Sequence, residues 1–180
     1  MSVNKLIILD RDGVINFDSN SYIKSPEEWV PIESSLRAIA KLNQAGYRVA
    51  IATNQSGIGR GMFDHTTLAM IHKKMEIELA KVGAHIDALE YCADHPQNAS
   101  YDRKPKTGMI KRLLKQFNAK ASETWFVGDS ISDIECAKNA ACVPVLVLTG
   151  KGQRTRIKMI KSNLLIFENL SLAIDNLLKI

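Results

Sequence analysis

Short apolar runs alternate along the chain with longer stretches in which apolar residues recur every three or four positions. The short runs are typical of buried strands, and the longer stretches predict amphipathic helices. The strands are expected at Lys5–Leu9, Tyr47–Ala52, Ile86–Tyr91, Thr124–Val127, Val143–Leu148 and, as a short edge strand, Leu164–Phe167. The helices are expected at Ser34–Gln44, Thr66–Val82, Gly108–Phe117, Ile131–Ala140 and Leu170–Leu178, with Asp64 as an N-cap and Gly46 as a C-terminal stop.

The order of these elements predicts the fold class. Repeated βαβ units imply a mostly parallel sheet with helices on both faces, which is a three-layer α/β/α, Rossmann-like architecture. The chain shows no internal repeat, low-complexity segment or linker, so we expect residues 1–180 to form one domain. Two stretches lack clear periodicity, residues 16–32 and 93–107, and we call them the first and second rim loops. Long irregular loops in compact domains are often functional.

Composition and charge narrow the class of protein. The formal net charge is +5, which favours anionic ligands, including phosphates and nucleic acids. The densest basic stretch, Lys151–Lys161, has few aromatic neighbours and no accompanying nucleic-acid motif, so we interpret it as a solvated surface segment and expect no nucleic-acid partner.

No apolar run approaches the roughly 18 residues of a membrane span, and the first apolar run is too short for a secretory signal. The three cysteines, Cys92, Cys136 and Cys142, are too few and too scattered for a disulfide framework. We therefore expect a cytoplasmic protein without a membrane partner, and a monomer.

Polar residues follow three of the predicted strands at the point where each strand ends. Asp10 and Asp12 follow the first strand, Thr53 and Asn54 the second, and Asp129 the fourth. Carboxyl ends of parallel strands meet at one edge of the sheet, where ligands bind. These side chains are therefore expected to converge although they are far apart in sequence.

Three aspartates at one edge would repel one another, and a hard divalent cation relieves that repulsion. Carboxylate and carbonyl oxygens suit Mg²⁺, which also binds substrate phosphate. Arg103 and Lys104 precede a predicted helix and can bring positive charge to the same place. Each single Asp is more often a helix cap or strand end, but the joint pattern in this order strongly favours a phosphate-handling magnesium site.

Four segments resemble the four motifs of the haloacid dehalogenase-like phosphatases: DRDG at 10–13, TN at 53–54, RKP at 103–105 and GDSISD at 128–133. The segment NQSGIGRG at 54–61 and the segment LTGKG at 148–152 look more narrowly like the heptose-1,7-bisphosphate 7-phosphatases, with the histidinol-phosphate phosphatases as a sister family. The resemblance covers residues 5–152. The connections are too short for the large cap domain that many relatives carry, so the rim loops must supply specificity.

The resemblance implies a role for each matching residue. Asp10 is the nucleophile and Asp12 the general acid and base. Mg²⁺ is held by the Asp10 carboxylate, the Asp12 main-chain carbonyl and Asp129. Thr53 and Lys104 bind the transferring phosphoryl group, which comes from a small phosphorylated metabolite.

The resemblance extends to several further residues. It implies that Asn54 orients Asp12 or the substrate, that Arg103 contacts the far end of the substrate, and that Asp133 orients Lys104 or a metal-bound water. From their place in the sequence, Tyr22 and Trp29 are candidates for stacking on a sugar or for loop packing, and Lys151 is a candidate substrate contact. His72 and His85 are expected on a helix surface and at a strand entry, without a function.

Two positions depart from the heptose-phosphatase pattern. That family usually holds a structural zinc with a Cys-x-His pair followed by a Cys-x-Cys pair. Here Asp94 stands where the His belongs, two positions after Cys92, and no cysteine lies between Cys92 and Arg103. We therefore expect no structural zinc. Ser130 follows Asp129 where the heptose enzymes typically carry a Lys.

Three alternatives stay open. The first is a histidinol-phosphate or other small-metabolite phosphatase with the same chemistry. The second is a receiver-like signalling domain, which also accepts a phosphoryl group on an Asp of a doubly wound sheet. Such a domain lacks a general acid two residues after that Asp. The third is an inactive scaffold, which the intact motifs disfavour.

Overall fold

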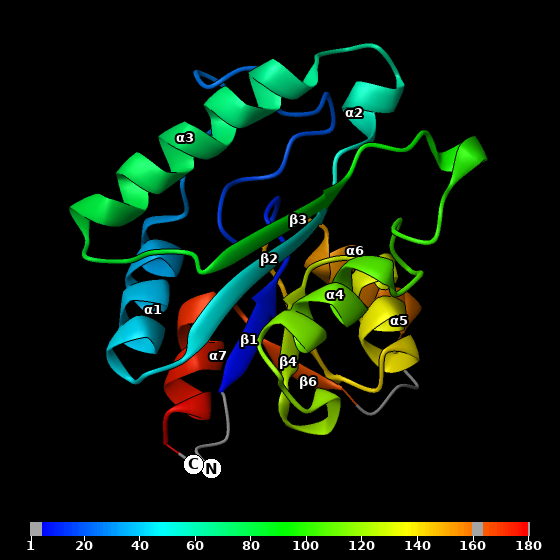
Figure 1. Ribbon diagram of the computed structural model, residues 1–180. Helices are drawn as coiled ribbons and strands as arrows, with labels where there is room; N and C mark the ends of the chain where they lie inside the picture. Colours follow the sequence, from blue (N-terminus) through cyan, green and yellow to red (C-terminus); the bar gives the residue numbers. More distant parts are fainter. Residues whose placement is uncertain (1–4, 160–163, 180) are drawn as a thin grey trace.

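The computed structural model of the protein describes residues 5–159 and 164–179. Within them, six strands form one sheet in the order β3-β2-β1-β4-β5-β6, and every pairing is parallel (Figure 1). The strands are β1 Leu6–Leu9, β2 Arg48–Asn54, β3 Ala88–Cys92, β4 Trp125–Gly128, β5 Val143–Val147 and β6 Leu165–Phe167. All six predicted strands are therefore confirmed, and so is the three-layer α/β/α class.

Helices cover both faces of this sheet (Figure 1). They are α1 Glu33–Gln44, α2 Ser56–Gly59, α3 His65–Lys81, α4 Gly108–Gln116, α5 Ile131–Asn139, α6 Gly152–Lys158 and α7 Leu170–Leu177, with 3-10 turns η1 Pro96–Asn98 and η2 Ala121–Glu123. The five predicted helices are confirmed. Helix α6 occupies the part of the basic stretch 151–161 that the structure describes, and residues 160–161 lie outside the described residues.

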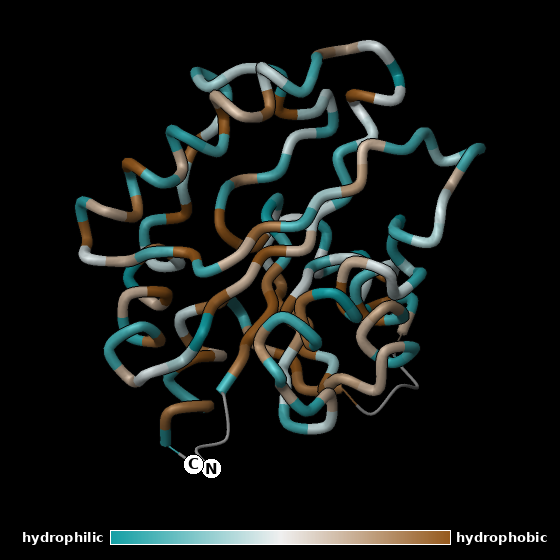
Figure 2. The backbone as a smooth tube through the Cα atoms, viewed as in Figure 1, coloured by the Kyte–Doolittle hydropathy of each residue, from teal (hydrophilic) through white to brown (hydrophobic). Residues whose placement is uncertain are grey.

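The central strand β1 shows why its sequence is continuously apolar. Ile7 and Leu9 pack with α1, α3 and α7 on one face, whereas Leu6 and Ile8 pack with α4 and α5 on the other. Figure 2 shows the hydrophobic residues concentrated along the central strands. A strand that is buried on both faces has no polar side to present to water.

The predicted helix ends are confirmed by their local geometry. The Asp64 carboxylate accepts a hydrogen bond from Thr67 N at the start of α3, at 2.7 Å. Gly46 follows α1 with φ +79°, a left-handed conformation that glycine adopts without a steric penalty. These ends place α3 and α1 at fixed positions along the sheet.

The two rim loops lie at the carboxyl edge of the sheet. The first is anchored by Trp29, whose side chain is fully buried in the cluster that contains Ile7 and Leu9. Trp29 is therefore a packing residue, and its candidate role in stacking on a sugar is wrong. Tyr22, in the same loop, has φ +65° and lines the cavity described below.

No helix in the described parts of the chain is both long enough and apolar enough to cross a bilayer. The three cysteines are all buried and free, and Cys136 and Cys142 lie in the layer formed by α4 and α5. All three are therefore small residues of the core.

Candidate active site

A cavity of about 380 Å³ opens at the carboxyl edge of the sheet. Its wall is built by the ends of β1, β2 and β4, by both rim loops, and by the segment that follows β5. Six of the seven residues predicted for the site line this cavity: Asp10, Asp12, Asn54, Arg103, Lys104 and Asp129. The convergence expected from the parallel topology is therefore observed.

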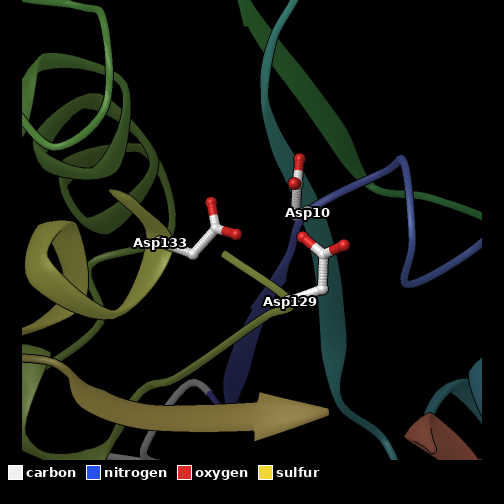
Figure 3. A group of neighbouring side chains, drawn as sticks. All are labelled: Asp10, Asp129 and Asp133. Atoms are coloured by element: carbon white, nitrogen blue, oxygen red, sulfur yellow. The ribbon is translucent and has the colours of Figure 1, made fainter. Parts of the chain in front are cut away.

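Three carboxylates meet at the floor of the cavity. Asp10 follows β1, Asp129 follows β4, and Asp133 lies in the first turn of α5; each is buried, and their oxygens lie within 4.8 Å of one another. Figure 3 shows the three side chains directed toward a common point. Of the three, Asp133 was expected to act on Lys104 or a bound water, and the structure adds its carboxylate to the acidic cluster.

Burial, together with repulsion between the acids, raises the pKa of two of these carboxyls. Burial raises the pKa of Asp10 to about 6, although the Lys104 ammonium opposes the shift. Burial and the neighbouring charges of Asp133 and Asp10 raise the pKa of Asp129 to about 8. The Asp129 carboxylate thus lacks enough compensating positive charge among the protein groups around it.

A divalent cation fits this deficit. The donor set is carboxylate oxygen only, which suits a hard cation such as Mg²⁺ better than zinc or copper. Lys104 supplies a single positive charge against three buried carboxylates. The Asp12 main-chain carbonyl, the third ligand in the sequence hypothesis, stays a prediction.

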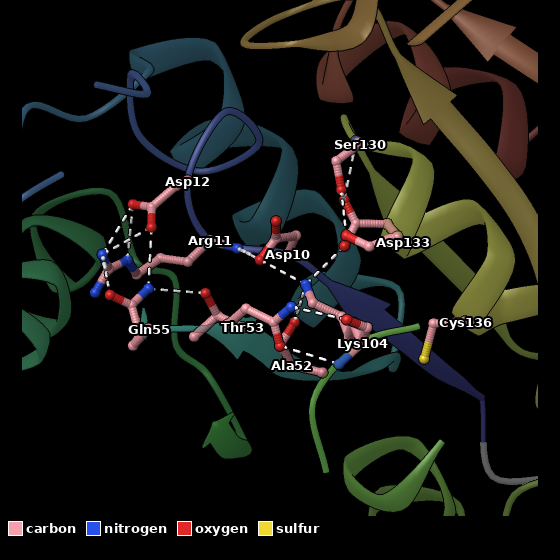
Figure 4. A network of polar contacts seen from close by, with 12 residues as sticks. Asp10, Arg11, Asp12, Ala52, Thr53, Gln55, Lys104, Ser130, Asp133 and Cys136 are labelled. Atoms are coloured by element: carbon pink, nitrogen blue, oxygen red, sulfur yellow. Dashed lines mark hydrogen bonds and ion pairs between the residues drawn. The ribbon is translucent and has the colours of Figure 1, made fainter. Parts of the chain in front are cut away.

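Lys104 is the buried cation beside the acidic cluster. Its Nζ lies 2.9 Å from Asp10 Oδ1 and 2.7 Å from Asp133 Oδ1, and it donates to the main-chain oxygen of Ala52 at 2.8 Å (Figure 4). Burial opposes the charge on Lys104, but the carboxylates of Asp10 and Asp133 outweigh burial and raise the pKa of the ammonium. The expectation that Asp133 orients Lys104 matches this contact.

Asn54 and Arg103 shape the second rim loop. Asn54 Nδ2 donates to the Lys104 oxygen and Asn54 Oδ1 accepts from Lys104 N, both at 3.1 Å. Asn54 thus orients the main chain of Lys104. The resemblance assigned it to Asp12 or to the substrate, and a contact with the substrate stays a prediction because Asn54 lines the cavity. Arg103 Nη1 donates to the main-chain oxygen of Asp94 at 3.0 Å, and its side chain lines the cavity.

Asp12 is held by residues that the sequence hypothesis left out. Its carboxylate accepts from the Arg11 guanidinium at 2.9–3.0 Å and from Gln55 Nε2 at 3.0 Å (Figure 4). It also accepts from Asn16 Nδ2 at 2.9 Å. Burial opposes ionisation of Asp12, but Arg11 and these hydrogen bonds outweigh it and lower the pKa of the carboxyl. In the sequence, this network was indicated by the polar residues of DRDG at 10–13 and NQS at 54–56.

Thr53 was also predicted for the site, but it is not among the described residues that line the cavity. It is fully buried, and its hydroxyl accepts from Gln55 Nε2 at 2.9 Å. Its contact with a phosphoryl group stays a prediction.

Two glycines allow the main chain to approach Asp129. Gly13 has φ +82° and Gly150 has φ +54°, and a Cβ on either residue would collide with the Asp129 carboxylate. Lys151 N donates to Asp129 Oδ2 at 2.7 Å. The loop after β5 therefore supports the acidic cluster through its main chain.

The side chain of Lys151 reaches across the cavity mouth. Its Nζ lies 2.9 Å from Asp18 Oδ2 in the first rim loop, and both residues line the cavity. Ser130, which stands where a Lys is typical, is the N-cap residue of α5, and its N and Oγ both donate to Asp133 Oδ2, at 3.0 Å and 2.6 Å. The side-chain cations at the mouth are thus Lys151, which is paired with Asp18, and Arg103, which donates to the Asp94 main chain.

The arrangement suits transfer of a phosphoryl group. A buried carboxylate, Asp10, lies beside a cation and a divalent-metal site, where negative charge on phosphate oxygens would be neutralised. A second carboxylate, Asp12, lines the same cavity and can exchange a proton with a reacting oxygen.

Comparison with known proteins identifies similar chains. The family model described as HAD-hydrolase-like matches residues 101–173. The chain is 47% identical over 174 residues to D-glycero-beta-D-manno-heptose-1,7-bisphosphate 7-phosphatase from Pseudomonas aeruginosa, which covers 97% of this chain and 98% of the relative. It is 50% identical over 151 residues to the protein of the same name from Neisseria meningitidis serogroup A, covering 84% of this chain and 81% of the relative.

A solved structure agrees with these sequence relatives. The crystal structure of D,D-heptose 1,7-bisphosphate phosphatase from B. bronchiseptica, complexed with magnesium and phosphate, superposes with a TM-score of 0.92. The two chains are 42% identical, and the match covers 97% of this chain and 98% of that one.

Proposed function

The chain belongs to the haloacid dehalogenase-like phosphatases, in the family of the D-glycero-D-manno-heptose-1,7-bisphosphate 7-phosphatases, and we propose that it hydrolyses the 7-phosphate of that heptose bisphosphate with Mg²⁺ as cofactor. The substrate is a small phosphorylated sugar. The β anomer is the preferred one in this proposal, because the relative from Pseudomonas aeruginosa carries that anomer in its name.

One observation carries the proposal: the Asp10 carboxylate, the Lys104 ammonium at 2.9 Å from it and the acidic cluster share one cavity with Asp12. A nucleophile, a cation for phosphate oxygens and a proton-transfer group are the three parts that a phospho-aspartate mechanism needs.

In the first step of the proposed mechanism, an Asp10 oxygen attacks phosphorus and the bond from phosphorus to the sugar oxygen breaks. Asp12 gives its proton to that leaving oxygen. Arg11 keeps Asp12 ionised in the free site, but a dianionic phosphate nearby favours its protonated form. Asp12 therefore takes up its proton as the substrate binds.

In the second step, water attacks the phosphorus of the aspartyl-phosphate and Asp12 accepts the proton of that water. The bond from phosphorus to the Asp10 oxygen breaks, which releases inorganic phosphate and restores the carboxylate. Asp10, Asp129 and the Asp12 carbonyl would hold Mg²⁺, which, when bound, supplies positive charge for the phosphate oxygens. Lys104 and Thr53 bind the same oxygens from the other sides.

The distal part of the substrate is bound at the cavity mouth. Arg103 and Lys151 carry the positive charges there, and both line the cavity. We assign to them the phosphate that is not transferred. Asn54 contributes by fixing the Lys104 main chain, through its two hydrogen bonds of 3.1 Å.

The remaining properties follow as proposals. Three buried free cysteines suit a reducing compartment, so we place the protein in the cytoplasm, as a monomeric single domain without nucleic-acid or membrane partners. We also propose that it holds no structural zinc, since His95 Nδ1 already accepts from Gln97 N and Asp94 accepts from Ser100 N. Stoichiometric zinc in protein purified without chelators would contradict this.

A substrate panel tests the proposal. Phosphate release would be measured with both anomers of the heptose bisphosphate, hexose monophosphates, histidinol phosphate and a nucleoside monophosphate, with and without Mg²⁺. We expect the highest kcat/KM for the heptose bisphosphate and a product that keeps one phosphate. A higher kcat/KM for histidinol phosphate would overturn the substrate assignment. Absence of Mg²⁺-dependent release from every compound would overturn the activity.

A further inference from the structure

The Arg11 side chain is fully buried between the two aspartates of the first motif. Its Nε and Nη2 donate to the Asp12 carboxylate, and Nη2 also donates to Gln55 Oε1 at 3.1 Å (Figure 4). A buried guanidinium needs acceptors for its remaining N–H groups, because water cannot reach them. The acceptor beside Nη1 is His72 Nε2, at 3.3 Å.

The direction of this contact is fixed by chemistry. Arginine stays protonated in proteins and has no acceptor atom, so Arg11 donates and His72 Nε2 must offer its lone pair. The imidazole is then neutral, with its hydrogen on Nδ1. Burial, together with the Arg11 charge, lowers the pKa of His72 to about 4, so the neutral form is present at physiological pH.

His72 is itself held in place from two sides. It lies in α3, directly after Ile71, which is fully buried, and at the boundary between the buried and the exposed face of that helix. The ring of Tyr91 packs edge-on against it, with the ring centroids 6.1 Å apart. The position of the imidazole is thus set by α3 and β3 and not by the reacting groups.

If His72 only filled space, an apolar side chain could replace it without any effect on Asp12. Here an apolar replacement would leave Nη1 of a buried cation without its acceptor. The guanidinium would have to move toward another acceptor, and the Asp12 carboxylate, which it contacts through two nitrogens, would move with it.

From these contacts we infer that His72 is a positioning residue for the acid/base carboxylate: its Nε2 accepts from Arg11 Nη1 and so fixes the guanidinium that orients Asp12. His72 does not line the cavity, so its effect on the reaction passes through Arg11. The inference rests on the proposed phosphatase activity and on the role of Asp12 within it. It adds a residue, 61 positions from Arg11, to the catalytic apparatus.

The test compares His72→Leu with His72→Gln. Leucine fills the space without an acceptor, whereas the glutamine amide oxygen can take the place of Nε2. The substrates are phenyl phosphate, whose leaving group needs a proton, and p-nitrophenyl phosphate, whose leaving group departs without one. We expect His72→Leu to lower kcat/KM for phenyl phosphate by roughly 10- to 100-fold. For p-nitrophenyl phosphate the loss is expected to stay within about threefold, and His72→Gln restores most of the activity on phenyl phosphate.

His85→Leu is the matched control, because His85 is exposed and lies before β3, away from the cavity. It should leave both rates unchanged. Equal losses of His72→Leu on both substrates would indicate general damage to the fold and overturn the inference. So would full activity of His72→Leu, or a His72→Gln variant no better than leucine.

The aryl phosphates also separate this inference from the proposed substrate. If the wild type hydrolyses them but not the heptose bisphosphate, the substrate assignment fails and the His72 comparison still decides the inference. If the wild type hydrolyses no phosphate ester, both fail together.

Discussion

Asp10 and Asp12 are two positions apart, yet their carboxylates lie in different electrostatic surroundings. Asp10 lies with Asp129 and Asp133 and contacts Lys104, whereas Asp12 contacts the Arg11 guanidinium. Burial raises the pKa of Asp10 to about 6, and the groups around Asp12 lower its pKa. Two neighbouring carboxyls with different environments can take the different roles of nucleophile and acid/base.

Asp12→Asn tests the proton-transfer role. The amide can still accept hydrogen bonds and leaves the main-chain carbonyl in place, but it cannot carry the proton. We expect kcat/KM for a sugar phosphate to fall by about 10²- to 10⁴-fold, while Mg²⁺ still raises the thermal midpoint. Asp175→Asn on α7, an exposed partner of Lys41, is the control. Wild-type hydrolysis of sugar phosphates by Asp12→Asn would make the acid/base assignment wrong.

Arg103 and Lys151 test the recognition of the distal phosphate. Arg103→Ala and Lys151→Met each remove a charged contact at the cavity mouth. We expect kcat/KM for the bisphosphate to fall by about 10- to 100-fold, and for a monophosphate of the same sugar to change by less than about threefold. Lys120→Ala, at the exposed N-cap position of η2, should change neither value. Equal losses on both sugars would contradict the role of these residues in recognition.

At the scale of elements, the first rim loop has a buried anchor and a face toward the cavity. Trp29 is fully buried against the sheet, and Lys74 of α3 donates to the main-chain oxygen of Pro26 at 2.6 Å. Tyr22 and Asp18 line the cavity. The loop is therefore held from beneath, and its exposed residues are available for specificity.

Trp29→Ala and Tyr22→Ala form a matched pair of aromatic truncations in this loop. Trp29→Ala should lower the free energy of unfolding by about 3–5 kcal/mol, as expected for a buried aromatic side chain. Tyr22→Ala should change the unfolding free energy by less than about 1 kcal/mol and raise KM instead. Urea denaturation and steady-state kinetics measure the two effects. A stability loss at Tyr22 as large as that at Trp29 would contradict the division of roles.

The elements with strong hydrophobic periodicity could be predicted from the sequence, and the others could not. Helix α2 spans the four residues Ser56–Gly59, which are too few to show periodicity, and it was not predicted. Strand β2 extends to Asn54, past its apolar part, because Thr53 and Asn54 pair with Tyr91 and Cys92. Local sequence does not contain that pairing, since it depends on the neighbouring strand.

At the scale of the whole molecule, the parallel topology brings the acidic residues to one edge, and this could be predicted. The contacts made by α3 could not. His72 was expected on a helix surface without a function, but α3 packs over the face of the sheet that contains Ile7 and Leu9, and this brings His72 to Arg11 (Figure 1). Such contacts depend on how a helix packs over the sheet, which periodicity alone does not specify.

The acidic cluster also couples metal binding to the stability of the fold. In the unfolded chain both Asp10 and Asp129 ionise near pH 4, but in the folded metal-free protein their pKa values rise to about 6 and about 8. Between about pH 4 and pH 8 the folded state binds more protons than the unfolded state, so the free energy of unfolding falls as the pH rises. Mg²⁺ replaces those protons and should remove the decline.

We therefore expect the thermal midpoint of chelator-treated protein to fall from pH 5.5 to pH 8, by roughly several degrees. Added Mg²⁺ should raise the midpoint more at pH 8 than at pH 5.5. Asp129→Asn should flatten this part of the pH dependence, because the amide does not titrate. A Mg²⁺ effect that is larger at the lower pH would contradict the coupling.

The phospho-aspartate mechanism is tested most directly by determining which residue carries the transferred phosphoryl group. Protein turning over the heptose bisphosphate in the presence of Mg²⁺ would be quenched in acid and digested, and its peptides examined by mass spectrometry. We predict a phosphoryl group on Asp10, heptose 1-phosphate in solution, and neither in Asp10→Asn. Turnover that leaves Asp10 unmodified, with the phosphoryl group on another residue or with activity retained by Asp10→Asn, would contradict the phospho-aspartate mechanism.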